Sequence, residues 1–524
     1  MKKIISLILT LCMMLSLVSV ASAANVEDDP IIYLMGAAGE IYDAEGNQIH
    51  PIGADAGAVI KEALVPCLEQ LALGYIKGDF EAYAEEFYNA FAPIYEKVKL
   101  DNNGEASDGS SCQWDVNTVG INDKKGDYRI FDYLFKYDWR LSPFQTAEEL
   151  KTYIDRVKAV TGKDKVNLVS RCYGSNVVAT YLEMYKDHAV ENVGKVLYYT
   201  PSIYGVTYLT AMFSGEIEFN GTAIDNFVDY YLANGDLFED DETKALLDTL
   251  VTFLNQIRVL DVATDAVKSI VDDVKGDLIP KLLKVSFGSW PSHWAMVLPE
   301  YYETAREFVF GDCEEEYAGL IDKIDAYHYD VQLKFEDTAK ELTAKGIKFY
   351  NIVKYNSPAY PLSKEAVEQS DCYTTVADQS FGAVAAKYGE ILSNKYIASI
   401  ENKAYLSPDN IIDGSGALWR DTTWYIRDLF HDEFPGYIHD RMFIDIFREN
   451  LTANNDKYPQ FLQYDKASGI VNPLVVTEEE KEQEQAKQEE NKWFTSIIRF
   501  FTAFFNFFAK LLRGELSFGD KEAA

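Results

Sequence analysis

The segment from Val166 to Tyr185 constrains the fold more than any other stretch of this sequence. It begins with an apolar run that is typical of a buried strand and continues with Ser-Arg-Cys-Tyr-Gly. A run with helical periodicity follows at once, so Cys172 stands at the tip of a sharp strand-to-helix turn. This is the layout of a nucleophile elbow, in which G-x-S-x-G lifts a nucleophile above the edge of a sheet. Here serine replaces the first glycine and Cys172 replaces the usual serine.

Cys172 is therefore the candidate nucleophile. The partial positive charge at the N-terminus of a helix stabilises a thiolate. Five cysteines remain after residues 1–23, and an odd number in an exported protein leaves at least one thiol unpaired or paired between chains. A buried cysteine that only packs is the alternative interpretation. No CxxC pair or histidine–cysteine cluster has zinc spacing, so neither a metal nor another cofactor is predicted.

The two ends of the chain differ from its centre. Residues 1–23 combine two lysines, a long apolar run and an Ala-Ser-Ala site, which predicts a secretory signal peptide and a secreted protein. Residues 476–491 form a charged linker, and residues 492–514 an aromatic amphipathic helix. Its polar stripe is basic, so we predict that residues 493–513 contact a membrane surface. Docking of this helix on the protein's own core or in an oligomer seam is the alternative.

The centre of the chain alternates strand-like and helical segments. The apolar runs that read as strands are residues 30–36, 128–136, 166–172, 195–199, 348–353 and 422–429. This alternation predicts an α/β domain over residues 24–475, with a mostly parallel sheet covered on both faces. A helical insertion is expected at about 53–120. The connection between the strands at 195–199 and 348–353 is too long for a plain loop, so a helical cap is expected at about 206–345.

Acyl transfer by a weak nucleophile needs a base beside it and an acid that orients the base. In the order nucleophile, acid, histidine, the base comes last. His431 lies just beyond the strand at 422–429 and is the preferred base, with His439 as the alternative. Asp371 follows the strand at 348–353 and is the preferred acid, with Asp378 as the alternative.

Two backbone amides are candidates for the oxyanion hole. The residue after the nucleophile, Tyr173, supplies one donor in such elbows. The second is expected from the Gly-Ala-Ala turn after the first strand, at Ala37. Backbone donors do not depend on side-chain identity, so the substitutions at the elbow leave this part of the prediction intact.

Taken together, these segments resemble the lecithin:cholesterol acyltransferase-like branch of the α/β-hydrolases and the bacterial lipases near it. The likeness spans about residues 30–450 and rests on Pro30–Gly39, Tyr137-Asp-Trp-Arg-Leu, Lys165–Tyr181, Tyr199-Thr-Pro-Ser, Trp290-Pro-Ser-His-Trp, Ser370-Asp371 and Thr423-Trp-Tyr-Ile with His431. The resemblance implies an α/β-hydrolase fold and a triad that cleaves or transfers acyl groups under a lid. It carries this triad over to Cys172, Asp371 and His431. The sequence departs from the family at Arg171, where histidine is usual, and at Ser170 and Ser175, which replace glycines.

The sequence therefore predicts a lipase-, esterase- or acyltransferase-like hydrolase that acts on an acyl ester or lipid. The alternative is a catalytically inactive hydrolase fold that serves as a binding protein at the cell surface. The formal net charge of −35 repels phosphate backbones, so nucleic acid is excluded as a partner.

Overall fold

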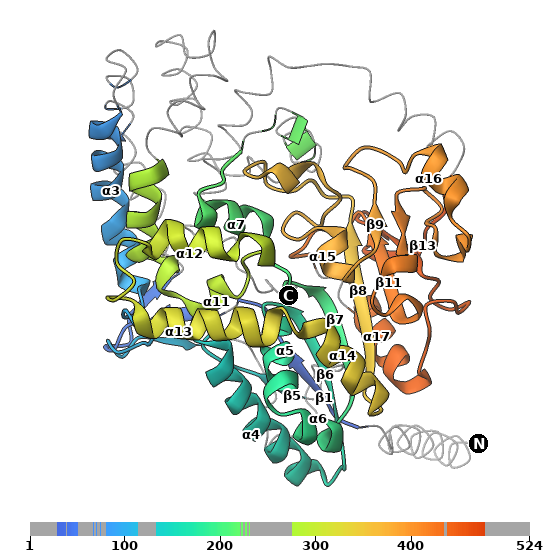
Figure 1. Ribbon diagram of the computed structural model, residues 1–524. Coiled ribbons are helices and arrows are strands. Elements are labelled where there is room, and N and C mark those ends of the chain that lie inside the picture. Colours follow the sequence, from blue (N-terminus) through green and yellow to red (C-terminus); the bar gives the residue numbers. More distant parts are fainter. Residues whose placement is uncertain are drawn as a thin grey trace, which may run out of the picture.

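The computed structural model describes residues 29–37, 39–50, 80–113, 133–218, 275–433 and 437–476, with a few isolated positions between them. The strands of its central sheet are β1 (Ile31–Leu34), β5 (Tyr133–Phe135), β6 (Val166–Cys172), β7 (Val193–Pro201), β8 (Lys348–Tyr355), β11 (Thr423–Arg427), β12 (Phe461–Asp465) and β13 (Ile470–Pro473). They lie in the order β13-β12-β11-β8-β7-β6-β1-β5 (Figure 1).

Every neighbouring pair in this sheet is parallel except β12 with β13. The predicted α/β class with a mostly parallel sheet is confirmed, and the strand order is consistent with an α/β-hydrolase-like fold. Because parallel strands share one direction, the carboxyl ends of β6, β8 and β11 lie at the same edge of the sheet. Chain segments that leave these three ends can therefore meet, although they are far apart in sequence.

The sheet extends beyond the last strand that the sequence analysis identified. The hairpin of β12 and β13 pairs through β12 with β11. Its residues are largely half-exposed or exposed, so the apolar signal of a buried strand is weak there. Two smaller sheets were also not anticipated: β3 (Gln48–His50), β2 (Glu40–Tyr42) and β4 (Ser111–Gln113) in one, and β10 (Ile412–Asp413) with β9 (Val384–Ala385) in the other.

Helices cover both faces of the central sheet. The helices of the described chain are α3 (Glu81–Tyr95), α4 (Pro143–Thr161), α5 (Gly174–Met184), α6 (Lys186–Asn192), α7 (Thr207–Ser214), α11 (Pro291–Trp294), α12 (Tyr302–Phe310), α13 (Ala318–Tyr327), α14 (Phe335–Ala344), α15 (Val376–Ser380), α16 (Asn394–Ser399) and α17 (Tyr437–Glu449). Single turns of 3₁₀-helix occupy Glu96–Val98, Phe287–Ser289, Pro299–Tyr301, Lys364–Val367, Lys403–Tyr405, Gly414–Gly416 and Arg420–Thr422, and η5 (His328–Gln332) is a π-helix.

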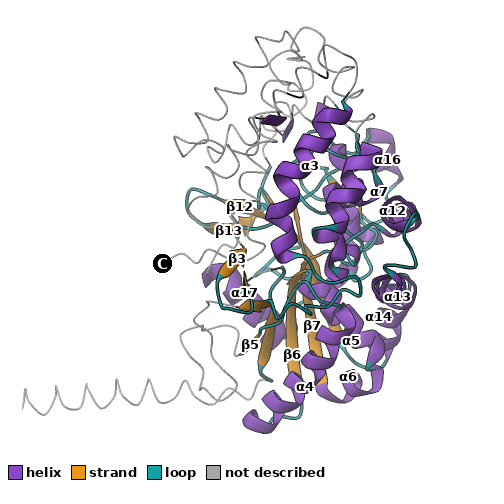
Figure 2. Cartoon of the chain, turned by 90° about the vertical axis from the view of Figure 1, so that its left-hand side faces the viewer, coloured by secondary structure: helices purple, strands orange, loops and turns teal. Residues whose placement is uncertain are grey.

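Alternate residues of β1 show how the two layers are formed. Ile32 and Leu34 pack into the core shared with α4 and α5, whereas Ile31 and Tyr33 pack into the core shared with α17. This is the period of two that a strand buried on both faces requires. Figure 2 shows the sheet between α17 on one side and α4, α5 and α6 on the other.

The described chain between β7 and β8 is mainly helical and forms hydrogen bonds with α5. Asn176 of α5 donates its side-chain amide to the carbonyl oxygen of Ala295 at 2.8 Å and to the hydroxyl of Tyr327 at 2.9 Å. Gln332 of η5 donates to the carbonyl oxygens of Ile203 and Val297, both at 2.9 Å. These buried bonds fix the described helices of this segment on the sheet. The cap boundaries themselves, 206 and 345, stay a prediction.

Several predicted segments lie outside the described residues. They are the signal peptide at 1–23, all but the first residue of the linker at 476–491, the amphipathic helix at 492–514 and most of the insertion before α3. Within the described part of the chain, no helix has both the length and the apolar character needed to cross a membrane.

The packing of α5 on β1 leads to a first prediction. A Cβ atom at Gly174 would lie 2.6 Å from the carbonyl oxygen of Met35 and 2.8 Å from that of Leu34. Because both atoms belong to backbone, they cannot move aside as a flexible side chain could. We expect Gly174→Ala to lower the free energy of unfolding by about 1–3 kcal/mol, as measured by chemical denaturation.

Gly276→Ala is the matched control, since nothing lies within 4 Å of the Cβ position there. That change is expected to be neutral or slightly stabilising, because alanine replaces glycine in a helix. Equal unfolding free energies for the two variants would contradict the close approach of α5 to β1.

Candidate active site

Cys172 ends β6 in a strained backbone conformation. Its φ angle is 48°, in the left-handed region that residues other than glycine rarely adopt. The thiol is free and buried, and α5 begins two residues later. Such an outlier costs on the order of 1–3 kcal/mol and persists only where the surrounding structure imposes it. A sharp turn of this kind between a strand and a helix is what a nucleophile elbow requires.

The serines that replace glycines at the elbow are accommodated by contact with each other. The hydroxyl groups of Ser170 and Ser175 lie 3.3 Å apart in a hydrogen bond, and both residues are fully buried. The only glycine of the motif that the sequence retains, Gly174, is the one that packs against the β1 carbonyl groups. The elbow therefore keeps the glycine that its close packing requires.

The structure brings His431 and Asp371 together. Nδ1 of His431 donates to Oδ2 of Asp371 at 2.6 Å, and the backbone amide of His431 donates to the carbonyl oxygen of Asp371 at 3.0 Å. Asp371 lies beyond β8, and His431 lies just beyond β11, the neighbouring strand in the sheet. Both side chains are buried. This double attachment fixes the imidazole in one orientation.

Asp371 is held as a carboxylate by the residues around it. Burial by itself would raise its pKa, but the His431 imidazole and the backbone amide of Thr374 favour the charged form and hold the pKa below its usual value. Its Oδ1 accepts from the amides of Tyr373 and Thr374, at 3.1 and 2.9 Å, and from the Thr374 hydroxyl at 3.1 Å. A carboxylate bonded in this way can stabilise a positively charged imidazole beside it.

Two neighbouring residues, Asp371 and Cys172, change the pKa of His431. Burial opposes the charged form, but Asp371 and the thiol of Cys172 outweigh it and raise the pKa to about 10. Among the described residues, no partner forms a well-aligned hydrogen bond with Nε2 of this ring. The sulfur therefore lies close enough to act on the charge of the imidazole without forming a well-aligned bond. Such bonds are often long in ligand-free sites and tighten when substrate binds.

Asp378, the alternative acid, is bonded to a residue other than His431. Asp378 accepts from the hydroxyl of Thr375 at 2.5 Å, within α15. Burial, together with Glu300 and Glu365, raises the pKa of Asp378 to about 7. Its backbone amide donates to the same hydroxyl, which makes the pair a helix cap. His439 is part of α17, and its side chain lies outside the described residues.

The expected oxyanion donors flank the elbow. Tyr173 is the residue before the first turn of α5, and Ala37 is a buried residue of the turn after β1. The hydroxyl of Tyr137 donates to the carbonyl oxygens of Met35, at 2.5 Å, and Gly36, at 3.3 Å. The Gly36 carbonyl and the Ala37 amide belong to one planar peptide group, so this hydroxyl helps to fix the direction of the amide.

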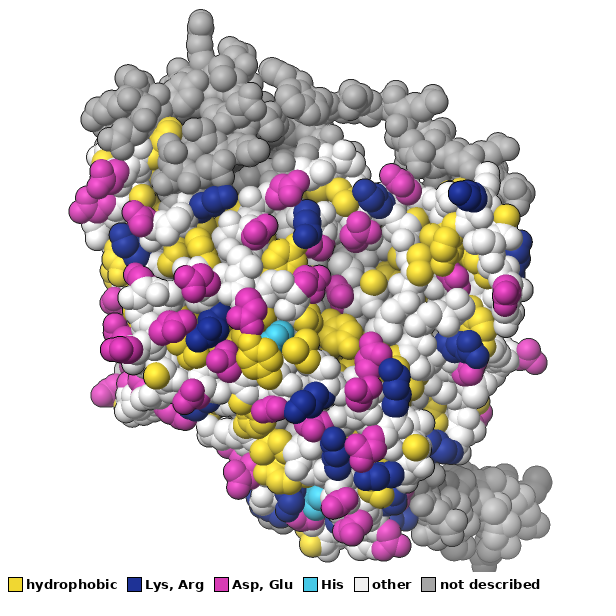
Figure 3. Space-filling view, viewed as in Figure 1, with side chains coloured by type: hydrophobic (Ala, Val, Ile, Leu, Met, Phe, Trp, Pro, Cys, Tyr) yellow, Lys and Arg dark blue, Asp and Glu magenta, His cyan; other side chains and the backbone are white. Residues whose placement is uncertain are grey.

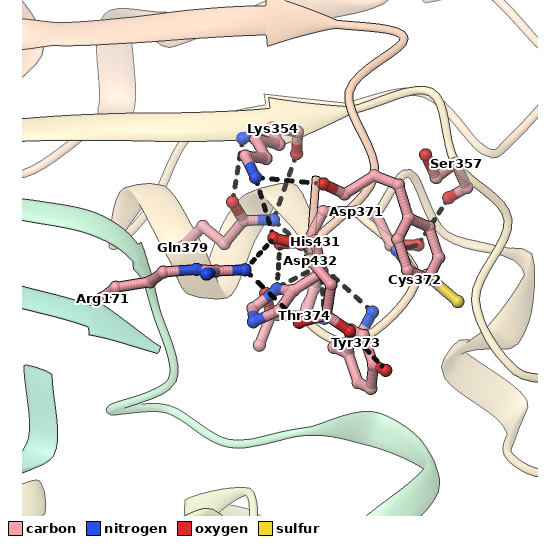
Figure 4. Close-up of polar contacts among 12 residues, drawn as sticks. Arg171, Lys354, Ser357, Asp371, Cys372, Tyr373, Thr374, Gln379, His431 and Asp432 are labelled. Carbon is pink, nitrogen blue, oxygen red and sulfur yellow. Dashed lines mark hydrogen bonds and ion pairs between the residues drawn. The ribbon is translucent and has the colours of Figure 1, made fainter. Parts of the chain in front are cut away.

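Two buried cations beside the site received no role in the sequence analysis. Lys354 near the end of β8 and Arg171 near the end of β6 both approach the backbone of His431. Figure 4 shows them reaching this segment from different strands. A lysine and an arginine within apolar strand sequences were the available signal, because such residues are rarely buried without specific partners.

The described surface carries charged groups of both signs. Figure 3 shows acidic side chains spread over the described surface of one face, with lysines and arginines scattered among them. Within the described ranges, no group of three or more His, Cys, Asp or Glu side chains is arranged to hold a metal ion.

Comparison with known proteins shows similarity to solved structures at low sequence identity, as one example illustrates. No family model matches the chain, and no curated protein matches it in sequence. A chain in a solved structure described as the crystal structure of the Tle4–Tli4 complex is similar, at 12% identity and a TM-score of 0.22. The match covers 63% of this chain and 75% of that one.

Asp371 bonds to His431 and Asp378 does not, so substitution of each carboxylate tests the pairing of His431 with Asp371. Asp371→Asn removes the charge that favours the His431 imidazolium, so we expect the pKa of His431 to fall well below about 10. Titration of the imidazole resonances by NMR measures this shift, with His431→Gln used for assignment. Asp378→Asn is the control and should leave the titration unchanged. An equal shift in both variants would contradict the pairing of His431 with Asp371.

Proposed function

We propose that the protein is a hydrolase or acyltransferase that acts on an acyl ester or lipid through Cys172, His431 and Asp371. One observation carries the proposal: a thiol at a strained strand-to-helix turn lies beside an imidazole whose other nitrogen is bonded to a buried carboxylate. A thiol that served only for packing would require neither the left-handed backbone nor the buried ion pair.

The proposed reaction proceeds in two steps. His431 takes the proton of Cys172, or holds the thiolate as an ion pair, and the sulfur attacks the carbonyl carbon of the substrate. The ester C–O bond breaks, His431 returns the proton to the leaving alcohol, and a thioester remains on Cys172. Water or an acceptor alcohol then loses a proton to His431 and attacks the thioester, which releases the acid or the new ester and restores the thiol. Asp371 stays ionised and stabilises the imidazolium in both steps.

The negative oxygen formed in each step is assigned to the amides of Ala37 and Tyr173. The close contact of Gly174 with the end of β1 supports this assignment, because it keeps the two backbone segments next to each other. Donors that are fixed before the reaction stabilise this charge without reorganisation.

The proposal on localisation rests on segments outside the described residues. An export signal at 1–23 and a membrane-contacting helix at 493–513 would place the enzyme outside the cytoplasm and close to lipid. Both stay predictions from the sequence.

Covalent trapping tests the nucleophile. After brief incubation with an activated acyl ester, intact-mass spectrometry should show one added acyl group on the wild type and none on Cys172→Ala. Cys313→Ala is the control, since that partly exposed free thiol contacts the ammonium group of Lys284, and its loss should leave the adduct in place. A wild type that forms no adduct and turns over no ester would favour the inactive binding protein instead.

The oxyanion assignment is tested through the residue that supports it. Tyr137→Phe removes the hydroxyl bonded to the turn that carries Ala37, and we expect kcat to fall roughly 10-fold or more with little change in KM. The matched control is Tyr153→Phe, whose hydroxyl donates to the carbonyl oxygen of Leu134 at 2.9 Å. Equal kcat values for the two variants would argue against the role of this turn.

A further inference from the structure

A buried lysine joins β8 to the segment that carries His431. We call residues 430–433 the histidine loop. The ammonium group of Lys354 donates to the carbonyl oxygens of Phe430 at 3.0 Å, His431 at 2.8 Å and Glu433 at 2.7 Å. It also lies 4.6 Å from the centre of the Tyr199 ring. The side chain is fully buried, and three acceptors match the three N–H groups of an ammonium ion.

The backbone of the same lysine is tied to the segment that carries Asp371. The Lys354 amide donates to Oε1 of Gln379 at 3.0 Å, and Nε2 of Gln379 donates to the carbonyl oxygens of Lys354 and Thr374, at 3.1 and 3.0 Å. Thr374 in turn donates to Asp371. Lys354 therefore connects, through its two ends, the acid and the base of the proposed triad.

Arg171 completes the surroundings of the histidine loop. Its Nη2 donates to the carbonyl oxygen of His431 at 3.0 Å and to Oδ1 of Asp432 at 3.4 Å. Asp432 also accepts from the Tyr373 hydroxyl at 2.9 Å. The carbonyl oxygen of His431 thus receives a donor from each of two buried cations, which come from β6 and β8.

Burial of the Lys354 ammonium group beside Arg171 has a cost in free energy. A charge removed from water costs several kcal/mol unless good partners replace the water. Burial, and then the neighbouring Arg171, lower the pKa of Lys354 to about 7, while Asp371, Asp432 and Glu433 oppose that shift. A loop that only needed packing could be supported by an apolar side chain at lower cost. The contacts of the ammonium group indicate what it accomplishes: it fixes the main chain on both sides of His431.

We propose that Lys354 is a positioning residue for the base, since it holds the histidine loop so that the imidazole stays between Asp371 and Cys172. The proposal rests on the proposed acyl-transfer function, but its first test does not need turnover. Lys354 does not touch the reacting atoms, and its effect passes through the backbone of His431. Misplacement of a catalytic group by about 1 Å can lower a rate by around 100-fold.

The test compares Lys354→Met with Lys348→Met. Lys348 begins the same strand at an exposed position, and its ammonium group contacts Oδ1 of Asn450 at 2.9 Å. In Lys354→Met we expect the pKa of His431 to fall by about one unit or more, because the imidazole leaves Asp371. Loss of a positive charge alone would raise the pKa of a neighbouring imidazole, so the sign separates displacement from simple electrostatics. Lys348→Met should leave the pKa of His431 unchanged.

Turnover provides the second measurement. In Lys354→Met we expect kcat for an activated acyl ester to fall about 10- to 100-fold, with KM changed much less. Lys354→Gln keeps two N–H donors without the buried charge, so it can replace the methionine variant if that variant does not fold. We expect a smaller fall in kcat for Lys354→Gln. An unchanged or raised His431 pKa together with an unchanged kcat in a folded variant would overturn the proposal. A lowered His431 pKa in a protein whose wild type has no turnover would support the positioning role and refute the acyl-transfer function.

Discussion

The left-handed backbone at Cys172 ends a buried strand, and it is held there because α5 starts two residues later against the end of β1. That contact requires glycine at position 174 and leaves no freedom for the turn to relax. It also sets the neighbourhood of the thiol, since the turn after β1 and the N-terminus of α5 are brought to the same place. The other features of the proposed site are arranged around a sulfur whose position is fixed in this way.

The base and the acid are placed by the parallel order of the sheet. β6, β7, β8 and β11 are successive neighbours, so segments that leave their carboxyl ends meet above one edge. Location at this edge does not by itself orient the His431 ring, because a loop can adopt many conformations. His431 is restrained at its ring, its amide and its carbonyl oxygen, by Asp371 and by two buried cations. The site thus depends on charged groups that are stable in the interior only because they contact one another.

Much of this could be predicted from the sequence, and the failures have identifiable causes. Strands buried on both faces give long apolar runs, so β6, β7 and β8 were recognisable, whereas the half-exposed hairpin of β12 and β13 was not. Asp371 and Asp378 both follow β8, so position after this strand does not distinguish them as the candidate acid. The structure distinguishes them, because the first bonds to His431 and the second caps α15. Lys354 and Arg171 were visible as charges in apolar strands, but a charge does not reveal its partner.

The sequence by itself determined the alternation of strands and helices, the sharp turn at Cys172 and the order in which thiol, carboxylate and imidazole occur. These follow from local properties: apolar periodicity, the permissiveness of glycine and the position of polar residues at strand ends. Only the tertiary structure decided which carboxylate reaches which ring and which cations hold the histidine loop. Those pairings join residues 60 to 260 positions apart. They are selected by the packing of the sheet and by the cost of leaving a buried charge unpaired, and neither can be evaluated before the chain has folded.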